Sequence, residues 1–257
     1  GFDQVRALGW PTALLVVGGV VLTIASGLLL ARWLGCRRDE GLVSGCAVGI
    51  CGASAALAVA SVLPPTRENE RFTLLAVVGV TVLSTLAMLL YPLLVQVLGF
   101  SAHQAGVFFG ATIHDVAQVV AAGMLLTQAG DTAAADSATI VKLMRVMLLL
   151  PVVLGVAAWV RRGEVPEAIA VDEDTPPRAN VPLVPTFLLG FVVLMAAVVA
   201  GASTLSRLLL VIAIAAAAIK TSLADLSQLG WRPVLMLVAE TVLLALGAGL
   251  AVGLGVG

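Results

Sequence analysis

The strongest constraint on the fold of this chain is a succession of long apolar segments with little polar sequence between them. A membrane-spanning helix needs about 20 mainly apolar residues, and roughly eight segments meet or approach that length. Because lipid offers the backbone no hydrogen-bond partners, such segments must be helical. The sequence therefore predicts an all-α, polytopic transmembrane protein. The expected spans are Trp10–Leu34, Leu42–Leu63, Phe72–Leu98, Ala105–Leu126, Ala138–Val160, Leu183–Gly201, Leu205–Ile219 and Pro233–Leu254.

The composition excludes several other classes of protein. Hydrophobic residues make up 60% and charged residues 11% of the 257 residues, whereas soluble globular proteins carry about 25% charged residues. A net charge of −1 gives no basic surface for nucleic acid. Cys36, Cys46 and Cys51 have neither a disulfide framework nor metal-type spacing, so we expect them to pack as small apolar residues. The sequence has no ATP-binding, zinc-protease or serine-hydrolase motif, and we expect no cofactor and no enzymatic activity.

One polar stretch divides the chain. Residues 161–182 hold eight charges and four prolines, and we interpret them as a solvated loop. The loop separates a transmembrane half with spans one to five (residues 1–160) from a half with spans six to eight (residues 183–257). Counting Lys and Arg on alternating sides gives eight against six, and the positive-inside rule then places this loop in the cytoplasm.

The two ends of the chain resemble each other. Leu8-Gly9-Trp10 matches Leu229-Gly230-Trp231, and both runs continue into apolar sequence. The first copy enters span one and the second enters span eight, so the copies run in opposite directions. Inverted repeats are typical of secondary transporters; chance similarity between two Leu-rich interfacial segments is the alternative. Because a span precedes the second copy, we expect the native protein to extend further at its amino terminus.

The densest polar group of any expected span lies in span four. His114, Asp115 and Gln118 occupy positions i, i+1 and i+4, so on a helix all three can face one cavity. Thr112 and the glycines nearby allow the helix to unwind and expose backbone groups to a substrate or ion. The alternative is a structural His–Asp contact between helices.

Span two has a related pattern of small residues. Cys51, Gly52 and Ser54 lie in the run Ser44–Ala55, which is rich in Gly, Ala and Ser. This run fits a tight helix–helix contact equally well as a broken helix whose free N–H groups face an anion.

Spans five, seven and eight contain ionisable residues. Lys142 and Arg145 share one helix face; they either snorkel to the interface or turn inward toward Asp115 or an anionic substrate. Glu240 is a candidate proton carrier or the partner of a Lys or Arg. The sequence leaves the roles of Glu240 and Lys220 open.

Several runs together resemble one family. They are ICGASA (Ile50–Ala55), TIHDVAQVVAAG (Thr112–Gly123), the K-L-x-R-V of Lys142–Val146, and TSLADLSQLGW (Thr221–Trp231). They are similar to the YeiH-like sulfate exporters of bacterial inner membranes. The resemblance implies inverted repeats with discontinuous helices that cross near the bilayer midplane. It also implies a sulfate-like or small organosulfonate-derived anion as the substrate.

We therefore predict a multi-pass protein of the bacterial inner membrane that exports a small anion by alternating access, coupled to an ion or a proton. In this hypothesis backbone amides of spans two and four bind the anion, Lys142 and Arg145 supply positive potential, and Asp115 and His114 titrate. A passive anion channel or a membrane sensor subunit is the alternative; the expected partners are the anion, the coupling ion or proton and the lipid bilayer, with a homodimer left open. An intramembrane enzyme built on His114 and Asp115 would lack a nucleophile or metal set.

Overall fold

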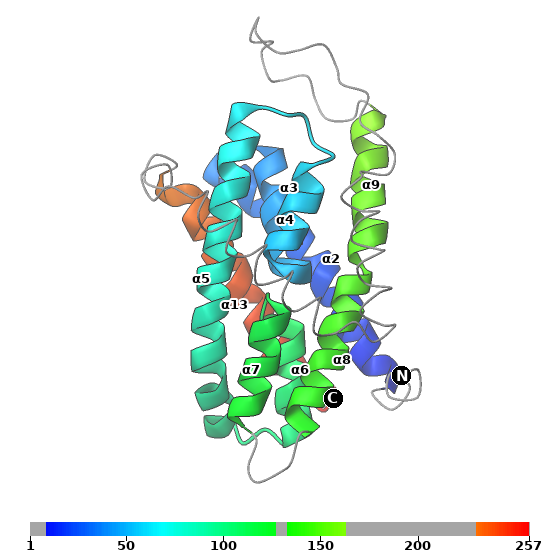
Figure 1. Cartoon of the computed structure of the whole chain (residues 1–257), viewed down its shortest axis with the longest axis vertical. Helices are drawn as coiled ribbons and strands as arrows, with labels where there is room; N and C mark the ends of the chain where they lie inside the picture. Colours follow the sequence, from blue (N-terminus) through cyan, green and yellow to red (C-terminus); the bar gives the residue numbers. More distant parts are fainter. Residues whose placement is uncertain (1–8, 127–132, 163–229, 257) are drawn as a thin grey trace, which may run out of the picture.

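The computed structural model describes residues 9–126, 133–162 and 230–256, and all regular structure within them is helical (Figure 1). Four helical segments are long and apolar enough to cross a membrane. The predicted all-α, polytopic membrane protein is therefore confirmed. The segments are α2 (Gly9–Leu34), α5 (Arg67–Val97), α8 (Ala133–Met147) continued by α9 (Leu149–Arg161), and α13 (Trp231–Gly253). The predicted spans Leu183–Gly201 and Leu205–Ile219, Lys220, and the polar loop beyond Arg162 lie outside the described residues.

Helix α3 (Arg38–Cys46), the π-helix η1 (Ala47–Cys51) and α4 (Ala53–Ala60) form a re-entrant hairpin, here called the first hairpin. The chain reverses at Gly52, whose φ of +67° is a conformation that residues with a Cβ rarely adopt. Asn69, near the start of α5, donates hydrogen bonds to Asp39 of α3 and to the Pro64 carbonyl beyond α4. Both arms therefore meet the same end of α5, while Gly52 lies beside Val80 near the middle of α5.

Helices α6 (Ala102–Thr112) and α7 (Val116–Leu125) form the second hairpin. Gly106 of α6 and Gly123 of α7 both lie against the start of α8 at Ala134 and Ala135, so the two arms run side by side. This hairpin starts just after α5 ends and so enters from the opposite end of the molecule (Figure 1). The two tips meet, since a Cβ built on Gly52 would lie 3.4 Å from the Cβ of His114.

The expected course of spans two and four was therefore wrong. Leu42–Leu63 and Ala105–Leu126 are discontinuous, as the family resemblance implied, but each turns back at mid-length instead of crossing. Apolar length cannot separate the two cases, because a hairpin and a crossing helix both hide about 20 residues from water. Eight crossing spans would place the connections at 35–41 and 99–104 on one side of the membrane, but the two connections lie at opposite ends of the molecule (Figure 1).

The hairpins also change the distribution of basic residues. Among the described residues, every Lys and Arg outside α8 lies near the end of α2 or α9 or near the start of α3, α5 or α13. These helix ends lie at the end of the molecule where the first hairpin enters, here called the arginine-rich end (Figure 1). Lys142 and Arg145 lie in the interior. The residues at the arginine-rich end are Arg32, Arg37, Arg38, Arg67, Arg71, Arg161, Arg162 and Arg232.

Helices α2 and α13, which carry the two similar sequence runs, pack against each other in opposite directions. Gly27 of α2 lies against Glu240, and Gly19 lies against Leu244. Each helix starts at a glycine with positive φ, +75° at Gly9 and +78° at Gly230. The opposed directions agree with an inverted repeat, which stays a prediction.

Candidate transport site

The hairpin tips meet around two buried cations of α8. Lys142 is 0% and Arg145 is 1% exposed. Their position follows from close packing of α8 on α6, because a Cβ on Gly110 would lie 2.5 Å from the Ala138 carbonyl oxygen. Glycine removes that clash and lets both basic side chains reach the tips.

Arg145 ties the two hairpins together. Its Nε donates to the carbonyl of Gly49 at 2.9 Å, and Nη2 donates to the carbonyls of Val48 and Gly49 at 2.8 and 2.7 Å. From the second hairpin, the carbonyls of Gly110 and Ile113 accept bonds from Nη1 at 3.1 and 3.3 Å. These five bonds match the five N–H donors of a guanidinium. The acceptors lie at the carboxyl-terminal ends of η1 and α6, where the helix dipole is negative.

Lys142 bridges the same two ends. Its Nζ donates to the carbonyls of Ile50 at 2.7 Å and Ile113 at 3.1 Å, so the Ile113 carbonyl is shared with Arg145. A third N–H of the ammonium has no partner among the described residues. In the described part of the chain, the ion pairs are those that Arg37 forms with Asp39 and with Glu68. Among the described residues, the two interior cations are therefore balanced by carbonyl dipoles and not by a carboxylate in contact.

The amino-terminal ends of α4 and α7 also lie at the tips, and they differ. Asp115 caps α7, accepting hydrogen bonds from the N–H groups of Ala117 at 2.8 Å and Gln118 at 3.3 Å. Helix α4 begins after Gly52 without a side-chain cap. Its Ser54 hydroxyl instead donates to Cys51, at 2.8 Å to Sγ. The second hairpin thus carries its own carboxylate at its positive helix end, and the first has no such side chain in the part of the chain that the structure describes.

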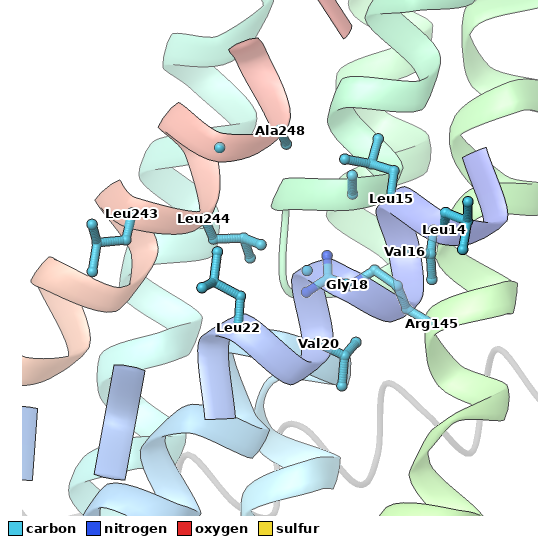
Figure 2. A pocket seen from close by; sticks show the side chains of 13 residues that line it. Leu14, Leu15, Val16, Gly18, Val20, Leu22, Arg145, Leu243, Leu244 and Ala248 are labelled. Carbon is cyan, nitrogen blue, oxygen red and sulfur yellow. The ribbon is translucent and has the colours of Figure 1, made fainter. Parts of the chain in front are cut away.

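A cavity of about 370 Å³ lies between α2 and α13 and reaches Arg145 (Figure 2). This size falls within the range of about 300–1,000 Å³ common for ligand pockets. Apart from Arg145, the lining is apolar, with Leu14, Leu22 and Leu244 as examples. The cavity uses the first half of α2 and the last half of α13, so it lies away from the arginine-rich end.

Comparison with known proteins agrees with a membrane protein. A family model described as conserved hypothetical protein 698 matches residues 1–237. The chain belongs to this family. A UPF0324 membrane protein of Chlorobaculum tepidum is 42% identical over 94% of this chain and 67% of its own length. The UPF0324 membrane protein TauZ of Paracoccus denitrificans is 45% identical over 94% of this chain and 71% of its own length.

A more distant UPF0324 membrane protein, from Bacteroides thetaiotaomicron, is 33% identical over 96% of this chain and 73% of its own length. No solved structure matches the chain. The UPF0324 proteins are the same family as the YeiH-like proteins, so the resemblance seen in the sequence is confirmed. The chain is a multi-pass membrane protein of a transporter-like family.

The polar residues of the second hairpin do not share one cavity, contrary to our expectation. That expectation assumed a continuous helix, but α6 ends at Thr112 and Ile113 is extended, with φ −69° and ψ 136°. His114 Nε2 lies 3.2 Å from the Thr241 hydroxyl of α13, and Gln118 donates to Thr85 of α5 at 2.8 Å. The Thr112 hydroxyl donates back to the Phe108 carbonyl.

Of the two alternatives for Lys142 and Arg145, the structure shows the inward orientation. Neither side chain snorkels, and neither forms an ion pair with Asp115 within 4 Å. Cys51, Gly52, Thr112, His114 and both cations are buried, whereas Ser54, Asp115 and Gln118 are half-buried. The residues proposed for the site therefore gather at the tips, but with individual partners that differ from those expected.

Several polar partners escaped the sequence analysis. The Ser84 hydroxyl accepts hydrogen bonds from the backbone N–H groups of His114 at 3.2 Å and Asp115 at 3.0 Å. Ser44 donates to Glu240 Oε1 at 2.8 Å, so the partner of Glu240 is a hydroxyl and not the Lys or Arg considered above. The sequence signal that could have identified these partners was their position as polar side chains in the middle of long apolar segments.

Proposed function

We propose that this chain is the membrane core of a secondary transporter that exports sulfate or a similar small anion by alternating access. The observation that carries the proposal is the pair of buried cations where two hairpins from opposite ends meet. Binding sites at mid-depth, built from discontinuous helices, are typical of secondary transporters. Buried cations that touch no carboxylate within the described ranges create a site where an anion supplies the missing charge.

The described residues offer the anion both charge and hydrogen-bond donors. Arg145 contributes charge, since carbonyl groups already use its N–H donors. Lys142 offers its remaining N–H, and the uncapped start of α4 at Ala53 and Ser54 offers backbone amides. We assign the anion to a position beside Lys142 at this end of α4.

The basic residues orient the protein. Under the positive-inside rule, the arginine-rich end faces the cytoplasm. The cavity between α2 and α13 then lies in the non-cytoplasmic half and leads to Arg145. In this proposal the site is open to the outer side in the described arrangement, and it opens to the cytoplasm in a second arrangement of the hairpins.

Transport by the reconstituted chain tests the proposal. Vesicles loaded with unlabelled sulfate should accumulate external labelled sulfate above its equilibrium level, because a carrier exchanges one anion for another. Lys142→Met should lower the initial rate at least about tenfold, equivalent to ~1.4 kcal/mol. Arg162→Met, which removes an exposed cation at the end of α9, is the matched control and should leave the rate unchanged.

Other outcomes would overturn the proposal in different ways. Sulfate that equilibrates without accumulating indicates a passive channel. Absence of flux with sulfate, together with absence of sulfate binding, would reject the anion. Equal flux in the wild type and Lys142→Met would reject the site.

A further inference from the structure

We propose that Lys142 is the coupling group of this transporter: its amine takes up a proton from solvent when the anion binds and returns it when the anion leaves. Anion and proton would then cross the membrane in the same direction. The inference rests on the proposed function and adds the identity of the coupling ion and the residue that carries it.

The first argument is the surroundings of Nζ. Carbonyl groups at unwound segments and at the carboxyl-terminal ends of half-helices are the groups that bind coupling cations in transporters. Here the carbonyls of Ile50 and Ile113, one from each hairpin, hold the Lys142 ammonium at 2.7 and 3.1 Å. A side-chain cation thus occupies the place of a metal cation at the junction of the two hairpins. Unlike a metal ion, it becomes neutral by releasing a proton.

The second argument is the charge around Lys142. Arg145 lies one helical turn along α8, shares the Ile113 carbonyl, and stays protonated in proteins. Both side chains are buried, so without an anion the positive charge of Arg145 disfavours a second positive charge at Lys142. An anion beside them favours the ammonium by simple Coulomb attraction. Binding of the anion and binding of the proton therefore reinforce each other, as linkage requires.

The other titratable groups near Lys142 are less suited to this role. The Asp115 carboxylate is held by the amides of α7, and the imidazole of His114 lies against Thr241. The Cys51 thiol lies near both cations and accepts a bond from Ser54. Glu240, on α13, is bonded to Ser44 away from the tips. Lys142 alone among these groups combines a releasable proton with a free N–H at the proposed anion position.

The proton step conserves protons, because each proton taken up from water is returned to water. The neutral amine of Lys142 accepts one proton from water on the side to which the site is open, and no bond to the anion forms. On the other side the ammonium returns that proton to water as the anion dissociates. No metal ion takes part.

Proton uptake by the purified chain tests the inference. Sulfate is added to protein in weakly buffered detergent solution, and both bound sulfate and protons taken up are measured. The wild type should take up close to one proton per bound sulfate at a pH where Lys142 is neutral in the empty site, and its apparent affinity should fall up to about tenfold for each further unit of pH. Replacing Na⁺ by choline should change neither quantity.

Variants identify the group. Lys142→Arg keeps a permanent positive charge, so the protons taken up per bound sulfate should fall to near zero and binding should lose its pH dependence. His114→Gln and Glu240→Gln remove two other buried titratable groups and should leave the ratio near one. Elution as a single species in detergent verifies that each variant folds, and the ratio corrects for any change in affinity.

The outcomes separate this inference from the proposed function. Sulfate binding without proton uptake, or equal uptake in Lys142→Arg, overturns the inference and leaves anion transport standing. Loss of uptake in Glu240→Gln with retention in Lys142→Arg assigns the proton to Glu240 and also overturns it. A requirement for Na⁺ would reject the argument that the Lys142 ammonium takes the place of a metal cation. Failure of the wild type to bind sulfate would overturn both proposals.

Discussion

The two hairpins solve the same problem differently. Each must reverse a helix inside the membrane, where unpaired backbone groups are expensive. The first hairpin widens into the π-helix η1 and turns at one glycine, leaving α4 without a side-chain cap. The second uses Ile113, His114 and Asp115 with ordinary negative φ at Ile113 and Asp115, and Asp115 caps α7.

The difference gives the two hairpins different roles under the proposed function: the second is held by its own side chains, and the first is left to bind the anion. At the second hairpin, Ser84 and Asp115 already accept the N–H groups of the turn and the first turn of α7. At the first hairpin, the start of α4 has no side-chain cap among the described residues. Under the proposed function, this difference assigns the exchangeable anion to the first hairpin, although the sequence signal was stronger at the second.

The largest effect is expected from removing the residue that both hairpins share. Arg145→Met leaves the carbonyls of Val48, Gly49 and Gly110 without their donor. Each buried unpaired group costs about 1–3 kcal/mol, so the free energy of unfolding should fall by about 3 kcal/mol or more. Thermal unfolding in detergent measures the loss. Arg162→Met is the control, and an equal melting temperature for both variants would contradict the role of Arg145.

The turn of the first hairpin should be the more sensitive to a side chain. Gly52→Ala places a residue with a Cβ in a backbone conformation of φ +67° and ψ −126°. This strain should lower the free energy of unfolding by about 1–3 kcal/mol. Gly18→Ala is the matched control, because a Cβ there meets nothing within 4 Å and the residue is helical. Thermal unfolding should show a loss at Gly52 and none at Gly18. The reverse order would reject the described turn.

The cap of the second hairpin should have a smaller effect. Asp115→Ala removes the acceptor for the N–H groups of Ala117 and Gln118, and loss of such a cap costs about 1 kcal/mol. Asp115→Asn keeps an acceptor oxygen and should retain most of the stability. Hydrogen exchange of the first turn of α7 measures the effect locally. Equal protection in both variants would show that the carboxylate does not hold this turn.

The smallest effect comes from giving the first hairpin the anion that it lacks. Ser54→Asp places a carboxylate in the first turn of α4, which favours the helix by about 0.3–1 kcal/mol. The same carboxylate should compete with sulfate and weaken its binding about fivefold, or ~1 kcal/mol. Ser54→Asn tests for size without charge. Sulfate affinity that is unchanged in Ser54→Asp would move the anion away from α4.

Part of the site could be predicted from residue types alone. Lys142 and Arg145 stand out because cations are rare in apolar spans, and the glycines around Gly52 and Thr112 mark interrupted helices. Their hydrogen-bond partners could not be predicted, since most are backbone carbonyls, which every residue carries. The common face assigned to His114, Asp115 and Gln118 was wrong because helical spacing does not apply across a break.

The sequence by itself determined the solvent and the secondary structure, since long apolar segments can satisfy their backbone in lipid only as helices. It also determined the family and the residue types available at the site. The direction of each broken segment was decided by tertiary packing, because Gly106 and Gly123 must both lie against the start of α8 to fill the space there. Packing likewise brought Lys142 and Arg145, far along the chain, to the first hairpin. Their N–H donors find carbonyl acceptors where the carboxyl-terminal ends of η1 and α6 meet.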